Sequence, residues 1–90
     1  MSENIRTVTI TNKRGLHARA SAKFVTLASQ QSALVEVAKD GQPVTGTSIM
    51  GLMMLGAAMG DSVTISATGD GAAKAVQLLA ELVESKFGEE

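Results

Sequence analysis

Cysteine, tryptophan and tyrosine are absent from this chain of 90 residues, which contains only one histidine and one proline. Without cysteine there is no disulfide framework and no thiolate nucleophile, and one histidine alone is a poor basis for a zinc site. The only aromatic residues are Phe24 and Phe87, so the core must consist of aliphatic side chains. We therefore expect no metal site and no bound cofactor.

Charge and long apolar runs are also scarce. The formal net charge is −1, which gives none of the basic excess typical of nucleic-acid-binding proteins. The longest apolar run, 49–59, is interrupted by glycines and is too short to cross a bilayer. The first residues lack the basic and apolar regions of a signal peptide. We expect a single cytoplasmic domain over 1–90, with neither nucleic acid nor membrane as a partner.

Alternation of apolar and polar residues predicts four strands, over 5–11, 33–39, 42–45 and 61–68. Asp40 and Gly41 predict a hairpin between the second and third strands. Pro43 lacks an N–H group, so the third strand is expected at a sheet edge. Thr7, Thr9 and Thr11 share one face of the first strand, and we expect this threonine-rich face to remain uncovered.

Helical spacing predicts three helices. The first begins near Leu16 and ends in 29–32, with a buried stripe of Leu16, Ala20, Phe24 and Leu27. The second, short helix covers 49–55, with Thr47 or Ser48 as its cap. The third is expected to be capped by Asp70 and ended by Gly88, with a buried stripe of Ala72, Ala75, Val76, Leu79, Leu82, Val83 and Lys86 or Phe87.

The order of elements is βαββαβα. Short antiparallel strands and three helices fit an α+β, open-faced two-layer sandwich, in which the three helices cover one face of a four-stranded antiparallel sheet. The sequence therefore predicts one layer of helices and one open sheet face.

His17 is the only side chain that titrates near neutral pH, and neutral imidazole is a good nucleophile. It lies at the predicted start of the first helix. There the free N–H groups of Ala18, Arg19 and Ala20, together with the helix dipole, form an anion site. The Arg19 side chain offers further donors for phosphate oxygens, and Gly15 allows the preceding loop to fold back. These residues suit a phosphoryl group held on a ring nitrogen.

A second informative segment begins at Ser48. The short helix after it is apolar on all sides, so some of its large side chains must be exposed. We expect Leu52 and Leu55 in the core. The expected docking patch for partner proteins consists of Ala20, Ile49, Met50 and Met53, because exposed methionine adapts to several partners.

Two motifs together resemble a known family. Residues 15–19, Gly-Leu-His-Ala-Arg, resemble the active-site motif of HPr, the histidine-containing phosphocarrier of the bacterial phosphotransferase system. Residues 48–52, Ser-Ile-Met-Gly-Leu, followed by Gly56, resemble the family's second signature, around its regulatory serine. The resemblance covers nearly the whole chain.

The resemblance implies a role for each of these residues. His17 would accept a phosphoryl group on Nδ1 from enzyme I, which draws it from phosphoenolpyruvate, and an EIIA-type protein would receive it. Arg19 would contact the phosphoryl group. Ser48 would match the serine that a protein kinase modifies in some branches. We expect a monomer that carries phosphate and is not an autonomous enzyme.

One position departs from the sugar-transport members of the family, where proline often follows the arginine. Here that residue is Ala20, and residues 18–22, Ala-Arg-Ala-Ser-Ala, look more like the nitrogen-related, regulatory branch. Two alternatives stay open. The chain could be a binding regulator that acts through the docking patch with a silent His17. It could also be a small nucleic-acid-binding module, although no aromatic residue falls on a predicted strand for base stacking.

Overall fold

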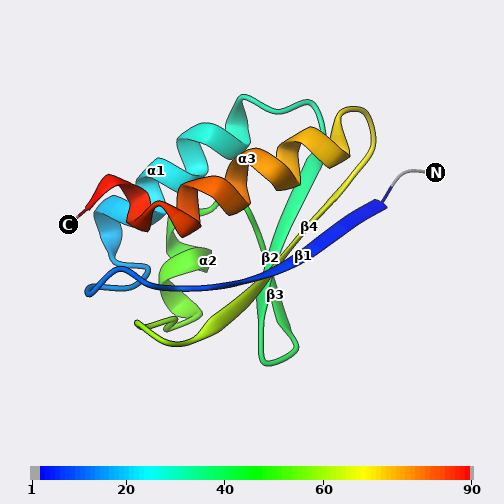
Figure 1. The fold of residues 1–90 in the computed structure, drawn as a ribbon. Helices are drawn as coiled ribbons and strands as arrows, with labels where there is room; N and C mark the ends of the chain where they lie inside the picture. Colours follow the sequence, from blue (N-terminus) through cyan, green and yellow to red (C-terminus); the bar gives the residue numbers. More distant parts are fainter. Residues whose placement is uncertain (1–2, 90) are drawn as a thin grey trace.

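The computed structural model describes residues 3–89, and Figure 1 shows the arrangement of their helices and strands. The elements follow the predicted βαββαβα order, with a short 3-10 helix added at the end. In chain order they are β1 (Glu3–Thr9), α1 (Ala18–Ser29), β2 (Leu34–Lys39), β3 (Gln42–Thr45), α2 (Ile49–Met54), β4 (Ser62–Thr68), α3 (Ala72–Glu84) and η1 (Lys86–Gly88).

The four strands form one antiparallel sheet in the order β1-β4-β2-β3. β3 is an edge strand, as Pro43 predicts. Val63, Ile65 and Ala67 of β4 are buried beneath the helices, whereas the opposite face is rich in hydroxyl groups. There Thr7 and Thr64 form a hydrogen bond of 3.1 Å between their side chains. The open-faced sandwich and its uncovered threonine face are confirmed.

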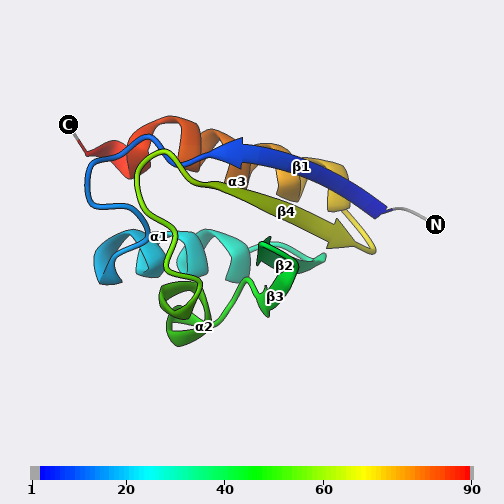
Figure 2. The same cartoon turned by 90° about the horizontal axis from the view of Figure 1, so that it is seen from below.

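The two long helices bring distant parts of the chain together. α1 and α3 run antiparallel in the helical layer, so the start of α1 lies near the end of α3 (Figures 1 and 2). Both aromatic residues lie in the core, with Phe24 in α1 and Phe87 in η1 each 1% exposed. This arrangement places the loop after β1 beside the tail of the chain.

Three leucines that were predicted to be buried, Leu27, Leu55 and Leu82, are only partly buried. Ala28, not Leu27, continues the buried face of α1, because the i, i+4 row through Ala20 and Phe24 faces the sheet. Leu27 packs half-buried at the rim of the core, and so does Leu55 at the end of α2. Leu52 is fully buried, as expected.

The end of β1 and the cap of α3 differ from the prediction for identifiable reasons. β1 ends at Thr9, because Ile10 leaves the ladder and bonds instead to the loop before β4, donating to the Asp61 carbonyl at 2.8 Å. The cap of α3 is Gly71, not Asp70. The chain enters α3 in the left-handed region with φ +76° at that residue, and glycine adopts this conformation without a steric penalty.

α3 ends at Glu84, before the predicted Gly88, and a left-handed turn follows. Lys86, Phe87 and Gly88 all have positive φ, at +62°, +56° and +77°. Residues other than glycine rarely adopt positive φ, so burial of the Phe87 ring must stabilise the turn. Lys23 of α1 donates a hydrogen bond of 2.7 Å to the Phe87 carbonyl. The turn thus folds the tail back onto α1.

Candidate functional site

His17 is the N-cap of α1, with extended backbone (φ −76°, ψ −179°). Its side chain does not cap the helix. The next three N–H groups, those of Ala18, Arg19 and Ala20, come too early in the helix for intrahelical partners. The helix dipole adds partial positive charge at this end. No side-chain cap therefore covers the N–H donors of the predicted anion site at the start of α1.

Gly15 lets the loop before His17 press against the chain before β4. Its φ is +64°, and a Cβ atom there would lie 2.4 Å from the Ala57 carbonyl oxygen. Leu16 donates a backbone hydrogen bond of 2.9 Å to that same oxygen. The Ser21 hydroxyl donates to the Leu16 carbonyl at 3.3 Å. These contacts fix the backbone on both sides of His17.

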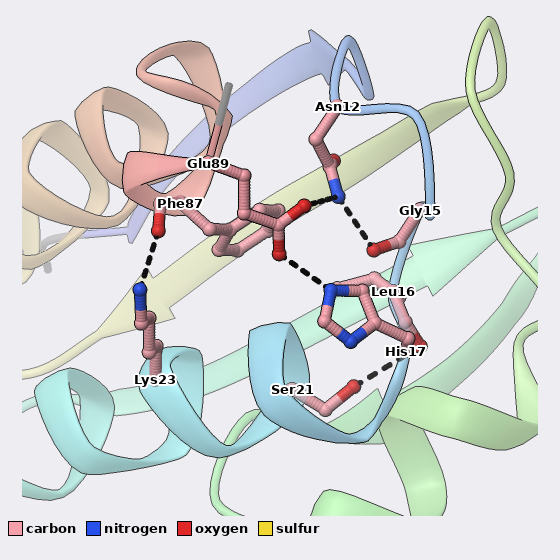
Figure 3. A network of polar contacts seen from close by, with 8 residues as sticks. All are labelled: Asn12, Gly15, Leu16, His17, Ser21, Lys23, Phe87 and Glu89. Atoms are coloured by element: carbon pink, nitrogen blue, oxygen red, sulfur yellow. Dashed lines mark hydrogen bonds and ion pairs between the residues drawn. The ribbon is translucent and has the colours of Figure 1, made fainter.

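The His17 imidazole is held by a carboxylate from the opposite end of the chain (Figure 3). Its Nε2 atom lies 2.5 Å from Oε2 of Glu89. The other oxygen of Glu89 accepts a hydrogen bond of 3.1 Å from Nδ2 of Asn12. The same Asn12 nitrogen donates at 2.8 Å to the Gly15 carbonyl. A network of four residues thus sets the position of the ring.

Sequence reasoning missed both partners of this network. Glu89 lies 72 positions from His17, so no short sequence motif links the two residues. A signal was present: the last helix ends just before Glu89, and an antiparallel pairing with the first helix returns that end to His17. Asn12 follows the predicted first strand, and nothing in the local pattern indicates that its side chain is fully buried.

The pKa of Glu89 lies below the ordinary value of a glutamate. The main cause is the hydrogen bond with His17, followed by the Asn12 hydrogen bond and the charges of His17 and Arg14. Its partial burial acts in the opposite direction. Glu89 is therefore a carboxylate at neutral pH and an acceptor at both oxygens.

Basic side chains surround the tail beside His17. A shallow cleft of about 400 Å³ is lined by Gly88 and Glu89 together with Lys13, Arg14, Arg19 and Lys23. Arg19 is exposed there, which agrees with its predicted contact to a phosphoryl group, although that contact stays a prediction. The other three cations were not predicted as part of the site. Their charge favours an anion at this end of α1.

Ser48 is the N-cap of α2, and its Oγ accepts a hydrogen bond of 2.9 Å from the Gly51 N–H group. Of the expected docking patch, Ile49, Met50 and Met53 are 41%, 69% and 41% exposed. Ala20 is 0% exposed, so its place in the patch was wrong. Met54, at 79% exposed, was not predicted and is the most exposed methionine of α2. From here the α2 patch means Ile49, Met50, Met53 and Met54.

Within 3–89, no group of three or more histidine, cysteine, aspartate or glutamate side chains is placed to hold a metal ion. No helix in this part of the chain is long and apolar enough to span a membrane.

The arrangement of a histidine at an uncapped helix start, after Gly15 and before Arg19, agrees with comparisons to known proteins. Residues 5–85 match the family model described as the PTS HPr component phosphorylation site. The chain belongs to the HPr family. HPr proteins are phosphocarriers of the phosphotransferase system and not enzymes. The family therefore assigns this chain a role as a phosphorelay intermediate.

The relatives cover nearly the entire chain. The phosphocarrier protein HPr of Cupriavidus necator is 44% identical over 84 residues, which are 93% of this chain and 94% of that protein. The phosphocarrier protein NPr of Shewanella violacea is 38% identical over 89 residues, or 99% and 98% of the two chains. The crystal structure of HPr-C-His from Thermoanaerobacter tengcongensis has a TM-score of 0.91 at 49% identity, and covers 100% of this chain and 99% of that chain.

Proposed function

We propose that this phosphocarrier accepts a phosphoryl group from enzyme I on Nδ1 of His17 and passes it to an EIIA-type protein. The observation that carries the proposal is the ring geometry: Nε2 is engaged by Glu89, whereas Nδ1 points away from that carboxylate (Figure 3). Neutral imidazole has one nitrogen with a lone pair, and only that nitrogen is a nucleophile. The Nδ1 lone pair is then the one that attacks phosphorus.

The surroundings of His17 suit the transferred group. The bare N–H groups at the start of α1 and the Arg19 side chain would receive phosphoryl oxygens, and the basic cleft would attract an anionic donor. During transfer the donor's bond to phosphorus breaks as the Nδ1–P bond forms. The electron pair returns to the donor nitrogen of enzyme I. The chain needs no base or substrate pocket of its own, because partner proteins supply the rest of the site.

We infer that the α2 patch is the surface that partners cover. α2 packs against α1, and four large side chains of α2 are exposed beside Ser48. A phosphoryl group or an aspartate at Ser48 would retain a favourable interaction with the helix start but would place a charge in an apolar interface. Modification of Ser48 by a serine kinase would therefore weaken docking.

A role in the nitrogen-related, regulatory branch is also proposed. It is supported by Ala20 in the place where many sugar-transport members have proline, and by the similarity to an NPr protein. The HPr dimer of known crystal structure from Thermoanaerobacter tengcongensis is 49% identical to this chain. For this chain we propose a monomer, since its exposed α2 patch is assigned to other proteins. Sedimentation velocity across a concentration series tests this, and a dimer would overturn it.

Incubation with enzyme I and phosphoenolpyruvate tests the proposed acceptor. Mass spectrometry under alkaline conditions should show one added phosphoryl group, because phosphoramidates survive base and are lost in acid. His17→Ala should fold and gain no phosphoryl group. An acid-labile phosphate in that variant would overturn the assignment, and an unmodified wild-type chain would favour the binding-regulator alternative.

Ser48→Asp tests the α2 patch. We expect an unchanged or slightly higher melting temperature, because aspartate also caps well, together with slower phosphorylation at limiting enzyme I. Thr68→Asp is the matched control, since Thr68 lies at the end of β4, away from both motifs. If Ser48→Asp accepts phosphate at the wild-type rate, partners do not bind there.

A further inference from the structure

The proton positions in the network around His17 follow from its contacts. Nδ2 of Asn12 lies 2.8 Å from the Gly15 carbonyl oxygen and 3.1 Å from Oε1 of Glu89. Both neighbours are acceptors, so the amide nitrogen of Asn12 must face them and its oxygen must face away. That oxygen is buried and has no hydrogen-bond partner among the described residues. The orientation of Asn12 is thus dictated by its two acceptors, although it leaves one polar atom unsatisfied.

The carboxylate of Glu89 connects the Asn12 amide to the His17 imidazole. One oxygen accepts from Asn12, and the other lies against Nε2 of His17. A carboxylate has no proton to donate, so Nε2 must carry the N–H group that joins them. The ring must then present its lone pair at Nδ1.

We propose that Glu89 and Asn12 are positioning residues that hold the imidazole of His17 in the tautomer with its proton on Nε2. The inference rests on the proposed function, because it matters only if Nδ1 is the phosphoryl acceptor. Neither residue touches the reacting nitrogen, and both act through the far side of the ring.

The tautomer affects both directions of phosphoryl transfer. On acceptance, the Nδ1 lone pair forms the bond to phosphorus while the Nε2 proton remains on the ring, shared with Glu89. On donation, the Nδ1–P bond breaks and its electron pair returns to Nδ1. With Nε2 still protonated, the leaving group is a neutral imidazole. Without that proton it would be an imidazolate anion, a much poorer leaving group. The proton thus stays in place through a full cycle and no base is required.

A glutamine at position 89 should reverse the preference. Its single oxygen would face Nδ2 of Asn12, because that nitrogen can only donate. Its amide nitrogen would then face Nε2 of His17 and donate to it, which requires the lone pair on Nε2 and the proton on Nδ1. Glu89→Gln removes the charge with almost no change of shape. It also favours a proton on Nδ1, which leaves that nitrogen without a lone pair to attack phosphorus. Glu89→Ala removes the charge but imposes no tautomer.

The ring nitrogens report the tautomer directly. ¹⁵N NMR of the unphosphorylated protein at about pH 8, where imidazole is neutral, distinguishes a protonated from an unprotonated ring nitrogen. We expect a protonated Nε2 in the wild type and in the matched control Glu81→Gln, which changes an exposed glutamate of α3. We expect a shift toward a protonated Nδ1 in Glu89→Gln.

Transfer rates provide the second measurement. Glu89→Gln should accept phosphate from enzyme I about 10-fold more slowly than Glu89→Ala, since one mismatched hydrogen bond opposes the reactive tautomer. Asn12→Ala combined with Glu89→Gln frees the glutamine amide to turn its oxygen toward Nε2, so the double variant should recover most of that loss. Unfolding curves must show that each variant is folded at the assay temperature.

Three results would overturn the inference: a wild-type ring protonated on Nδ1, a Glu89→Gln ring with an unchanged tautomer, or equal rates for Glu89→Gln and Glu89→Ala. Faster transfer in both variants would also overturn it and would show that Glu89 obstructs the site by its charge. The NMR measurement needs no enzyme I. It therefore tests the tautomer even if phosphoryl transfer to His17, and with it the proposed function, fails.

Discussion

Helices α1 and α2 begin in opposite ways. α2 is capped by Ser48, whose hydroxyl accepts a hydrogen bond of 2.9 Å from the N–H group of Gly51. α1 begins at His17, which has extended backbone geometry but makes no side-chain cap. A capping hydrogen bond typically contributes about 0.5–2 kcal/mol to folding, so α1 lacks a stabilisation that α2 has. The uncapped start is the one that leaves donors for an anion.

The two starts also differ in what holds them. The cap of α2 is local, three residues from its donor. The start of α1 depends on contacts distant in sequence: the Glu89 carboxylate and the close approach of Gly15 to Ala57. The comparison teaches that a helix start whose N–H donors stay open is positioned by residues outside the helix, because a residue that capped it would occupy those donors. Five predictions test this view.

The largest effect is expected from removing the core packing of α1. Phe24 is 1% exposed in the middle of its buried face. Phe24→Ala should lower the free energy of unfolding by about 3–5 kcal/mol, a large share of the total for a domain of this size. Urea unfolding measures it, with Phe24→Leu as a milder control. A melting temperature that barely moves would mean that α1 does not depend on this face.

Loss of Arg19 should affect transfer and not folding. A charge-assisted contact to phosphate contributes about 1.5–3 kcal/mol, so Arg19→Ala should slow phosphorylation by about one to two decades if the contact is fully formed in the transition state. Rapid-quench kinetics with enzyme I measure this. Unchanged kinetics would show that the backbone donors of α1 suffice without the guanidinium.

Removing the cap of α2 should cost stability alone. Ser48→Ala should lower the free energy of unfolding by about 1 kcal/mol while phosphorylation by enzyme I continues at the wild-type rate. Chemical denaturation and transfer kinetics on the same preparation test both halves. Equal stability would contradict the difference drawn between the two helix starts.

Adding a side-chain cap at the start of α1 should have a smaller effect on stability, and this effect should be stabilising. In a Glu89→Ala background, which removes the His17 contact, His17→Ser should raise stability by about 0.5–1 kcal/mol, because serine caps well. The parent for comparison is Glu89→Ala alone. No gain would indicate that the first N–H groups of α1 are already satisfied.

The smallest effect is the loss of stability that we expect when the pH is lowered. The pKa of Glu89 is lower in the folded protein than in the unfolded chain, so Glu89 contributes stability that is present above the ordinary glutamate pKa and is lost as pH falls through the lowered value. Between about pH 5 and pH 3, the wild type should therefore lose more stability than Glu89→Ala. Urea unfolding across this range measures it, with Glu81→Ala as control. Parallel curves would contradict the contact.

The sequence predicted features that depend on neighbouring residues. The element order, the edge position of Pro43, the serine cap and the histidine at a helix start all follow from local pattern. Tertiary contacts decided the rest. The Glu89–His17 contact required the pairing of α1 with α3 and the left-handed turn at Lys86, and the local pattern indicates only that the last helix ends before Glu89.

One error was avoidable by geometry. Ala20 was placed both on the buried stripe of the first helix and in the docking patch, and one side chain does not face both ways. Its burial follows from the i, i+4 row that includes Phe24. Met54 was missed because the short helix is apolar on every side, so periodicity does not reveal its exposed face.

The distance along the chain between His17 and Glu89 has a consequence for synthesis. A ribosome that adds about 5–20 residues per second needs about 4–14 s to travel the 72 positions between them. Through that interval the nascent chain contains His17 without the carboxylate that holds its ring. The finished site therefore forms only after residue 89 has been added, and a translation product that ends before residue 89 would contain the histidine motif without Glu89.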